Sequence, residues 1–235
     1  MTSPGSVLVA GESLVDVVIG PDGEVIEVAP GGAPLNIAVG LARLGVITRL
    51  LTTFGEDEHG DRVARHLSAS GVEVHPGSRV RAATSVARAL LDRRHQATYE
   101  FELSWDPPDA VLPTDCQAVH VGSLGTVTEP GAARMRQLAA RARAAGVVVS
   151  YDPNVRPAVL TDVPDPWQDV RRHAAGAGVV KLSDQDAEHL QPGRPLDDVL
   201  DDLLRGEQTL LAVVTRGEQG IRLATPADRV DVPAP

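Results

Sequence analysis

Residues 31–55 read GGAPLNIAVGLARLG followed by VITRLLTTFG, and they contain signals for a turn, a helix and a strand in succession. Two adjacent glycines and a nearby proline predict a tight turn, because glycine allows backbone conformations that residues with a Cβ resist. An apolar run of helical spacing begins at Asn36 and ends before Gly45, which predicts a helix with glycine just past its end. A buried strand should follow at residues 50–54.

Asn36 stands at the expected start of this helix. Its side chain offers both a donor and acceptors, beside the backbone amides that a helix N-terminus exposes. This arrangement suits a polyhydroxylated ligand. The alternative is that the glycines form only a loop and that Asn36 is only an N-cap, which would be preferred if the glycine cluster stood alone.

The whole pattern resembles the first signature of the PfkB (ribokinase-like) family of carbohydrate kinases. The matching positions are Gly31, Gly32, Asn36, Ala38, Gly45 and Gly55, and Asp57 and Gly60 continue it in the Gly-x-Asp-x-x-Gly arrangement that the family often shows. The resemblance implies a ribokinase-like α/β fold, with helices on both faces of a mostly parallel sheet and a small β-sheet lid over the sugar.

Composition and charge exclude several classes of partner. The formal net charge is −10, so a nucleic-acid backbone or an anionic membrane would be repelled. A single cysteine, Cys116, rules out an intramolecular disulfide and a Cys-based zinc cluster. The longest uncharged run, residues 28–42, is shorter than the roughly 20 residues of a membrane span, and no signal-peptide pattern begins the chain. We therefore expect a cytoplasmic protein with neither nucleic acid nor membrane as its partner.

Strands and helices alternate along the chain, which predicts a mostly parallel sheet with helices on both faces. Two segments with polar turns should instead form hairpins. In the family two such excursions make the lid, so the resemblance implies one domain over residues 1–235 with lid segments at about 12–30 and 83–105. The other expected strands are 7–11, 72–74, 117–121, 147–151, 179–182, 210–215, 221–224 and 229–232, and the other expected helices are 57–70, 129–145, 169–175, 184–190 and 196–204.

Asp16 follows the first strand. An isolated aspartate at a strand end is usually a solvated carboxylate. In the family an aspartate at this place binds sugar hydroxyls, so the resemblance implies that Asp16 binds sugar together with Gly31, Gly32 and Asn36.

Residues 152–157, DPNVRP, follow a predicted buried strand. Ligands of open parallel sheets bind beyond the carboxyl ends of the strands, and an extended segment would project Asp152, Asn154 and Arg156 to one side. The alternative is an Asp152–Arg156 pair that stabilises a loop. The motif resembles the same strand end in the fructokinase and 2-keto-3-deoxygluconate kinase branches, which implies that Arg156 contacts sugar or phosphate and that Asn154 contacts the nucleotide.

Residues 181–188, KLSDQDAE, resemble the family's Asn-x-x-Glu motif, with Ser183 in place of Asn and Asp186 in place of Glu. The resemblance implies that both contact the cofactor, ATP, and that the Asp186 carboxylate acts on hydrated Mg²⁺ as the metal site. A helix N-cap by Ser183 is the competing explanation, and the two are compatible.

Residues 214–220, VTRGEQG, resemble the Thr-x-Gly-x-x-Gly nucleotide loop of the family. The resemblance implies that Thr215, Gly217 and Gly220 contact ATP. By spacing alone the segment is a turn between two strands.

The chain contains no P-loop, no Gly-x-Ser-x-Gly, no His-Glu-x-x-His and no dinucleotide-binding fingerprint after the first strand, so phosphoryl transfer is the chemistry that remains. It also lacks the family's second signature, Asp-Thr-x-Gly-Ala-Gly-Asp, whose last aspartate is the catalytic base. We expect that base beyond Pro235, no catalytic residue within this truncated chain, and little activity. Asp152 and Asp186 are the first alternative bases if the chain is active.

The resemblance thus implies a fructokinase-like kinase that transfers the γ-phosphoryl group of ATP, with Mg²⁺, to a hydroxyl of a small sugar or keto-sugar acid. It allows a homodimer through the lid. Two alternatives stay open: a non-catalytic sugar- or nucleotide-binding protein, and a nucleoside kinase of the same superfamily. The sequence does not choose the acceptor.

Overall fold

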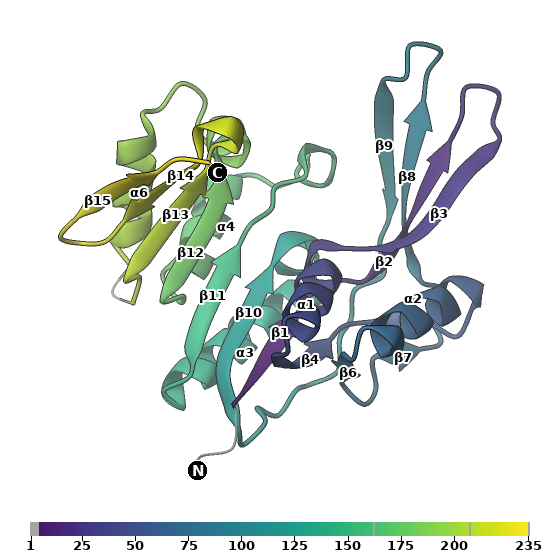
Figure 1. The fold of residues 1–235 in the computed structure, drawn as a ribbon, viewed down its shortest axis with the longest axis horizontal. Helices are drawn as coiled ribbons and strands as arrows, with labels where there is room; N and C mark the ends of the chain where they lie inside the picture. The colour runs from purple at the N-terminus through teal and green to yellow at the C-terminus, as the bar shows by residue number, and fades with distance from the viewer. Residues whose placement is uncertain (1–4, 162, 207, 235) are drawn as a thin grey trace.

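A nine-stranded main sheet organises the molecule, and a four-stranded sheet rises from one end of it (Figure 1). The computed structural model describes residues 5–161, 163–206 and 208–234. The main sheet runs, in spatial order, through β15 (Arg229–Val232), β14 (Ile221–Ala224), β13 (Leu211–Thr215), β12 (Val179–Ser183), β11 (Val148–Asp152), β10 (Cys116–Gly122), β1 (Ser6–Ala10), β4 (Ile47–Leu51) and β6 (Glu73–Val74). The small sheet runs through β3 (Val25–Gly31), β2 (Leu14–Ile19), β8 (Ser85–Leu91) and β9 (Ala97–Glu102), and β5 (Phe54–Gly55) pairs with β7 (Arg79–Val80).

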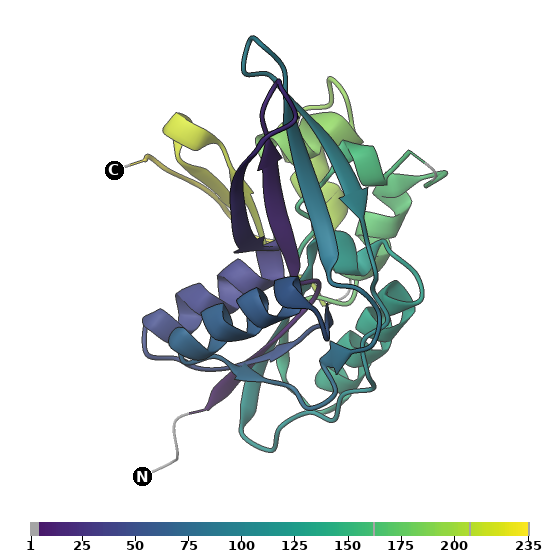
Figure 2. The same ribbon diagram turned by 90° about the vertical axis from the view of Figure 1, so that its right-hand side faces the viewer.

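Helices cover both faces of the main sheet, as the sequence predicted (Figure 2). One apolar cluster packs the sheet against the later helices, and a second packs it against the earlier ones. The period-two pattern explains the layering, because Val180 and Leu182 are buried while Lys181 between them faces the opposite side. The helices are α1 (Ala33–Arg43), α2 (Glu58–Ala69), α3 (Gly131–Ala144), α4 (Pro166–Ala174), α5 (Asp184–Leu190) and α6 (Leu196–Leu204), with 3₁₀ turns η1 (Ser123–Thr126), η2 (Pro157–Val159) and η3 (Gly217–Gln219).

Helix α1 begins three residues earlier than predicted. Gly32 is its N-cap, with φ 106°, and Pro34 lies in the first turn, where its missing N–H costs nothing. The backbone N–H of Asn36 donates to the Gly32 carbonyl, so the reading of Asn36 as the opening residue or N-cap is wrong. Gly45, with φ 83°, does follow the helix end as expected.

Two other element boundaries also differ. The single strand expected at 50–54 is divided, because the chain leaves the main sheet after Leu51 and Phe54 then pairs with Arg79 of β7. Helix α4 begins at Pro166 instead of residue 169, since the Asp165 side chain caps it by accepting the N–H of Gln168 at 2.9 Å.

The small sheet consists of two antiparallel hairpins, as predicted, joined by a parallel pairing that was not predicted. Leu14 at the start of β2 is the partner of Ser85 at the start of β8. This pairing brings the two excursions of the chain into one sheet. Within the described parts of the chain, no helix has both the length and the apolar character needed to cross a membrane.

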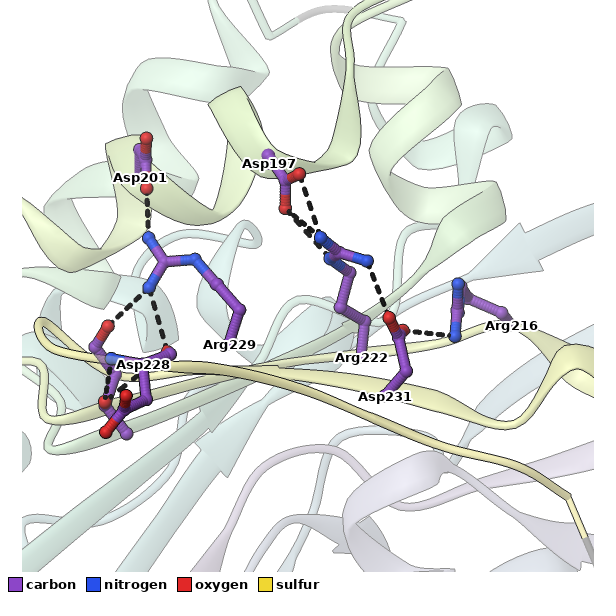
Figure 3. A network of polar contacts seen from close by, with 8 residues as sticks. Asp197, Asp201, Arg216, Arg222, Asp228, Arg229 and Asp231 are labelled. Carbon is purple, nitrogen blue, oxygen red and sulfur yellow. Dashed lines mark hydrogen bonds and ion pairs between the residues drawn. The ribbon is translucent and has the colours of Figure 1, made fainter.

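The last hairpin is attached to α6 by charged side chains (Figure 3). The guanidinium of Arg222 on β14 donates to both carboxylate oxygens of Asp197 on α6, each at 2.9 Å, and to Asp231 on β15 at 2.8 Å. Arg229 on β15 pairs with Asp201 on α6. One arginine therefore joins two strands to the helix that covers them.

Candidate active site

A cavity of about 720 Å³ lies where the small sheet meets the carboxyl ends of β1, β10 and β11. Both layers of the molecule contribute to its wall. Its lining includes Glu12, Leu14, Asp16, Gly32, Ala33, Asn36, Ile37, Ala87, Tyr99, Phe101, Ser123, Leu124, Asp152, Asn154, Val155, Arg156, Pro157 and Ala158. Four of the five residues expected to bind sugar are among them.

The fifth, Gly31, lies directly against the carboxylate of Asp16. A Cβ on Gly31 would lie 2.0 Å from Asp16 Oδ2, so only glycine leaves room for the carboxylate at this place. Partial burial raises the pKa of Asp16, while the positive charge of Arg156 lowers it. Gly32 has φ 106°, and a Cβ there would lie 2.7 Å from the Glu12 carbonyl oxygen. Gly31 thus leaves room for the Asp16 carboxylate, and Gly32 lets the backbone pass close to that of Glu12.

The segment after β11 reaches the cavity by a different path from the one predicted. Asn154 has φ 39°, in the left-handed region, so the segment is not extended and the period-two argument fails. Asp152, Asn154 and Arg156 all line the cavity nevertheless. The alternative Asp152–Arg156 pair is not the one formed, because Asp152 Oδ2 accepts from Lys181 Nζ at 3.0 Å. Arg156 Nη1 instead donates to the Val155 carbonyl at 2.9 Å.

Lys181, the only lysine in the sequence, is therefore part of the site's surroundings. Burial raises the pKa of Asp152, and the neighbouring ammonium group of Lys181 lowers it. The ion pair of Asp152 and Lys181 thus lies at the carboxyl end of the sheet, next to the cavity.

Asp186 and Ser183 form a capping box at the start of α5. Ser183 Oγ accepts the Asp186 N–H at 2.9 Å, and Asp186 Oδ2 accepts the Ser183 N–H at 2.8 Å. Asp186 Oδ1 accepts the N–H of Val155 at 2.9 Å, and the side chain is buried. Both carboxylate oxygens are thus engaged by backbone amides.

Each carboxylate oxygen of Asp186 accepts one backbone N–H and keeps a further lone pair, so its action on hydrated Mg²⁺ stays a prediction. Within the described residues, no group of three histidine, cysteine, aspartate or glutamate side chains could hold a metal ion by itself. Asp186 also connects two segments of the chain, since it holds Val155 of the cavity wall against the end of β12.

Most of the residues expected to contact ATP lie outside the cavity, near the ends of β12 and β13. Thr215 at the end of β13 is the direct partner of Ser183 at the end of β12. Gly217 has φ 53° and open space where a Cβ would be. Gly220 has a different explanation, because a Cβ there would lie 2.0 Å from the Val232 carbonyl of β15. Of the predicted cofactor residues, Asn154 alone also lines the cavity.

Among the charged residues that line the cavity, Glu12 is the one that the sequence analysis did not single out. Its side chain is 3% exposed, and its Oε2 accepts the N–H of Gly125 at 2.8 Å. Burial raises its pKa to about 7. Hydrogen bonds from Ser123 and from backbone amides favour the charged form and partly offset this rise. The local signal is only a glutamate directly after a buried strand, because its partners come more than a hundred residues later.

Comparison with known proteins gives a matching family model, several relatives and solved structures of the same fold. The family model described as pfkB family carbohydrate kinase matches residues 6–235. The fructokinase of Rhizobium leguminosarum bv. trifolii is 32% identical, over 97% of this chain and 72% of its own length. The probable chloroplastic fructokinase-6 of Arabidopsis thaliana is 30% identical over 92% of this chain, which spans only 60% of that relative. The crystal structure of fructokinase with bound ATP from Xylella fastidiosa superposes with a TM-score of 0.85 at 26% identity, covering 98% of this chain and 78% of that one.

Proposed function

Because this chain belongs to the pfkB family of carbohydrate kinases, we propose that it has a fructokinase-like role: it binds a small sugar in the 720 Å³ cavity, for transfer of the γ-phosphoryl group of ATP to a sugar hydroxyl. The observation that carries the proposal is the set of polar side chains that line the cavity. Asp16 offers acceptors, Arg156 offers donors, and Asn36 offers both. Apolar surface from Tyr99 and Phe101 faces the same space.

The charges around the cavity favour a neutral sugar over a keto-sugar acid. Three carboxylic acids, Glu12, Asp16 and Asp152, line it, against the single guanidinium of Arg156. Part of that guanidinium is already used on the carbonyl of Val155. Asp152 is paired with Lys181, and Asp16 and Glu12 lie in the same lining as Arg156, so an anionic acceptor would meet no excess of positive charge; we therefore propose a ketohexose such as fructose as the preferred acceptor.

We place ATP along the ends of β12 and β13, at Ser183, Thr215 and Gly217. Asn154 would then lie between the nucleotide and the sugar. Support comes from the strand register and from the ATP that the Xylella fastidiosa fructokinase holds. Mg²⁺ would neutralise charge on the phosphates, and any influence of Asp186 on it would pass through water or the backbone. A cytoplasmic location and a homodimer through the small sheet are further parts of the proposal.

Sugar binding is the direct test, because it measures the contact between the cavity and its ligand without requiring turnover. We would titrate fructose, 2-keto-3-deoxygluconate and adenosine into the chain by calorimetry. We expect binding of fructose, and at least a roughly tenfold loss of affinity in Asp16→Ala and in Asn36→Ala, since each removes hydrogen bonds made to the ligand. Asp22→Ala, at the exposed turn between β2 and β3, is the matched control.

Two outcomes would overturn the proposal. Binding of adenosine without fructose would favour the nucleoside kinase alternative. Unchanged fructose affinity in both cavity variants would reduce Asp16 and Asn36 to structural residues.

A further inference from the structure

Lys181 lies between the cavity and the strand ends at which we place ATP. Its Nζ donates to Asp152 Oδ2 at 3.0 Å, and Asp152 lines the cavity. On its other side β12 pairs with β13, where Ser183 is the partner of Thr215. A phosphoryl group that passes from ATP to the sugar must move from one of these places to the other, and Lys181 carries the positive charge between them.

Alternation along the strands puts the polar groups of this region on one face of the main sheet. The side chains at every second position of β11, β12 and β13 belong to the core that packs against the later helices. The positions between them face the opposite side. The polar side chains on that side are Ser150, Asp152, Lys181, Ser183 and Thr215.

The ammonium group of Lys181 keeps donors for a ligand. An ammonium group has three N–H donors, and Asp152 is its one hydrogen-bond partner within the described parts of the chain. The Lys181 side chain is 38% exposed, against 16% for that of Asp152, so the ammonium group reaches solvent more than the carboxylate does. The ion pair thus holds the ammonium group in place and leaves part of its surface open to an anion.

Other basic side chains near this face are used elsewhere or are neutral. Arg216, directly after β13, donates to Asp231 of β15 at 2.6 Å, and Arg156 donates to a backbone carbonyl at 2.9 Å. Burial and the charge of Lys181 lower the pKa of His120 on β10 to about 4, so this histidine is uncharged at pH 7. A triphosphate at the ends of β12 and β13 would otherwise meet hydroxyl and backbone donors, which are weaker partners for phosphate than a cation.

We propose that Lys181 is a phosphate-binding residue, whose ammonium group contacts the terminal phosphate of ATP while Asp152 holds it beside the sugar cavity. The inference rests on the proposed sugar kinase function and adds a cation to the nucleotide contacts named there. The terminal phosphate is the one assigned, because the group that is transferred must lie closest to the sugar and Lys181 is paired with a residue of the cavity lining.

The first experiment uses the fact that the chain has no other lysine. Acetylation of Lys181 by an N-hydroxysuccinimide ester would be followed by mass spectrometry of peptides, with the N-terminal amine as the internal reference. The β,γ-imido analogue of ATP with Mg²⁺, at about ten times its Kd, should slow acetylation about tenfold, because only the unoccupied chain reacts. ADP with Mg²⁺ at the same occupancy should leave the rate close to that of the free chain, since it lacks the terminal phosphate.

The second experiment is calorimetry of both nucleotides with variants of Lys181. Lys181→Met keeps an unbranched side chain and removes the charge, so we expect affinity for the analogue to fall at least about tenfold while affinity for ADP changes less than about twofold. Lys181→Arg keeps the charge and should lose less. Arg172→Met removes a positive charge from an exposed side chain of α4, and as the matched control it should bind both nucleotides as the wild type does.

The ratio of the two affinities separates a phosphate contact from a structural effect. Equal losses for ADP and for the analogue in Lys181→Met, or equal protection of Lys181 by both, would overturn the inference, because neither depends on the terminal phosphate. Unchanged affinity of Lys181→Met for the analogue would reduce Lys181 to the structural partner of Asp152, while the proposed function would stand. Absence of nucleotide binding by the wild-type chain would contradict the proposed function, and the inference with it.

Discussion

The buried acid Glu12 should make the stability of the protein depend on pH. Its pKa is about 7 when folded and about 4.5 when exposed, so the folded state holds the proton more tightly. Its contribution to stability is complete below about pH 4.5, is lost as pH rises to about 7, and is constant above. We expect Glu12→Gln to be more stable than the wild type at pH 8 by up to about 3 kcal/mol, and by less than about 1 kcal/mol at pH 5. Urea unfolding at both pH values measures this difference. The same change in the free energy of unfolding between pH 5 and pH 8 in both proteins would contradict the prediction.

Gly31 should matter for ligand binding through its lack of a side chain. In Gly31→Ala the new methyl group would lie where Asp16 Oδ2 now is, so the carboxylate must turn away. We expect fructose affinity to fall at least about tenfold while the unfolding transition stays cooperative. Calorimetry and thermal unfolding of the same variant separate the two effects. Unchanged affinity would show that Asp16 does not need its present position.

For single residues, sequence analysis located the polar side chains of the cavity better than the residues that hold them in place. Asp16, Asn36 and Arg156 were predicted to bind sugar, and all three line the cavity, although their sugar contacts are still a prediction. Glu12 was missed because a glutamate after a strand is usually solvated, and its burial depends on Gly125, far along the chain. Asp186 was predicted to act on Mg²⁺, and this stays a prediction, whereas its contact with the N–H of Val155 could not be read from the local sequence.

Helix α1 offers a simple gain in stability. Gly40 lies in its exposed interior, and a Cβ there would have no neighbour within 4 Å. We expect Gly40→Ala to stabilise the protein by about 0.5–1 kcal/mol, because alanine loses less backbone entropy than glycine in a helix. Thermal unfolding measures the gain, and fructose affinity should be unchanged. A lower midpoint would mean that the exposed face of α1 packs against something.

The arginine network of Figure 3 should hold the last hairpin to α6. Arg222→Met would remove a bidentate contact to Asp197 and a third bond to Asp231, and leave both carboxylates without that partner. We expect a loss of about 1–2 kcal/mol in urea unfolding that shrinks in 1 M NaCl. Arg62→Met is the control, because Arg62 makes a single surface pair with Glu58 and should cost at most about 0.5 kcal/mol. Equal losses of stability in the two variants would show that the network stabilises the protein no more than a single surface ion pair does.

Among whole elements, sequence was most accurate where turn chemistry is unambiguous. The hairpin of β14 and β15 has the predicted bounds, since the turn at residues 225–228 separates two short strands with arginine or aspartate between their apolar residues. The strand expected at 50–54 is divided because Phe54 is recruited by β7, a distant partner that local pattern cannot reveal. The early start of α4 depends on an Asp-Pro pair at 165–166, a capping signal present in the sequence but not used.

The molecule as a whole should respond to sugar mainly in its small sheet. Strand β9 is largely exposed, and it lies at the edge of that sheet, whereas β10 lies inside the main sheet. We expect amide hydrogens in β9 to exchange faster than those in β10, and fructose to slow exchange in β2 and β9, since Asp16, Tyr99 and Phe101 line the cavity. Hydrogen exchange measured by mass spectrometry checks this. Slowing confined to the ends of β12 and β13 would place the sugar elsewhere.

The cavity itself could not be predicted as a shape. A mostly parallel sheet, helices on both faces and two hairpins were predicted from the sequence, and all three are confirmed. The cavity exists because β2 pairs in parallel with β8, which sets the second hairpin beside the first above the carboxyl ends of the main strands. Local pattern specifies each hairpin but not the neighbour it chooses.

That same pairing has a consequence for synthesis of the chain. The β2–β3 hairpin leaves the ribosome well before its partner, because α1, β4, β5, α2, β6 and β7 lie between β3 and β8 in the chain. Until then β2 has an open edge, which is a template for unwanted strand pairing. Nascent chains arrested before residue 85 should therefore depend more on holding chaperones than chains released after β9, and the first hairpin is where their binding should concentrate.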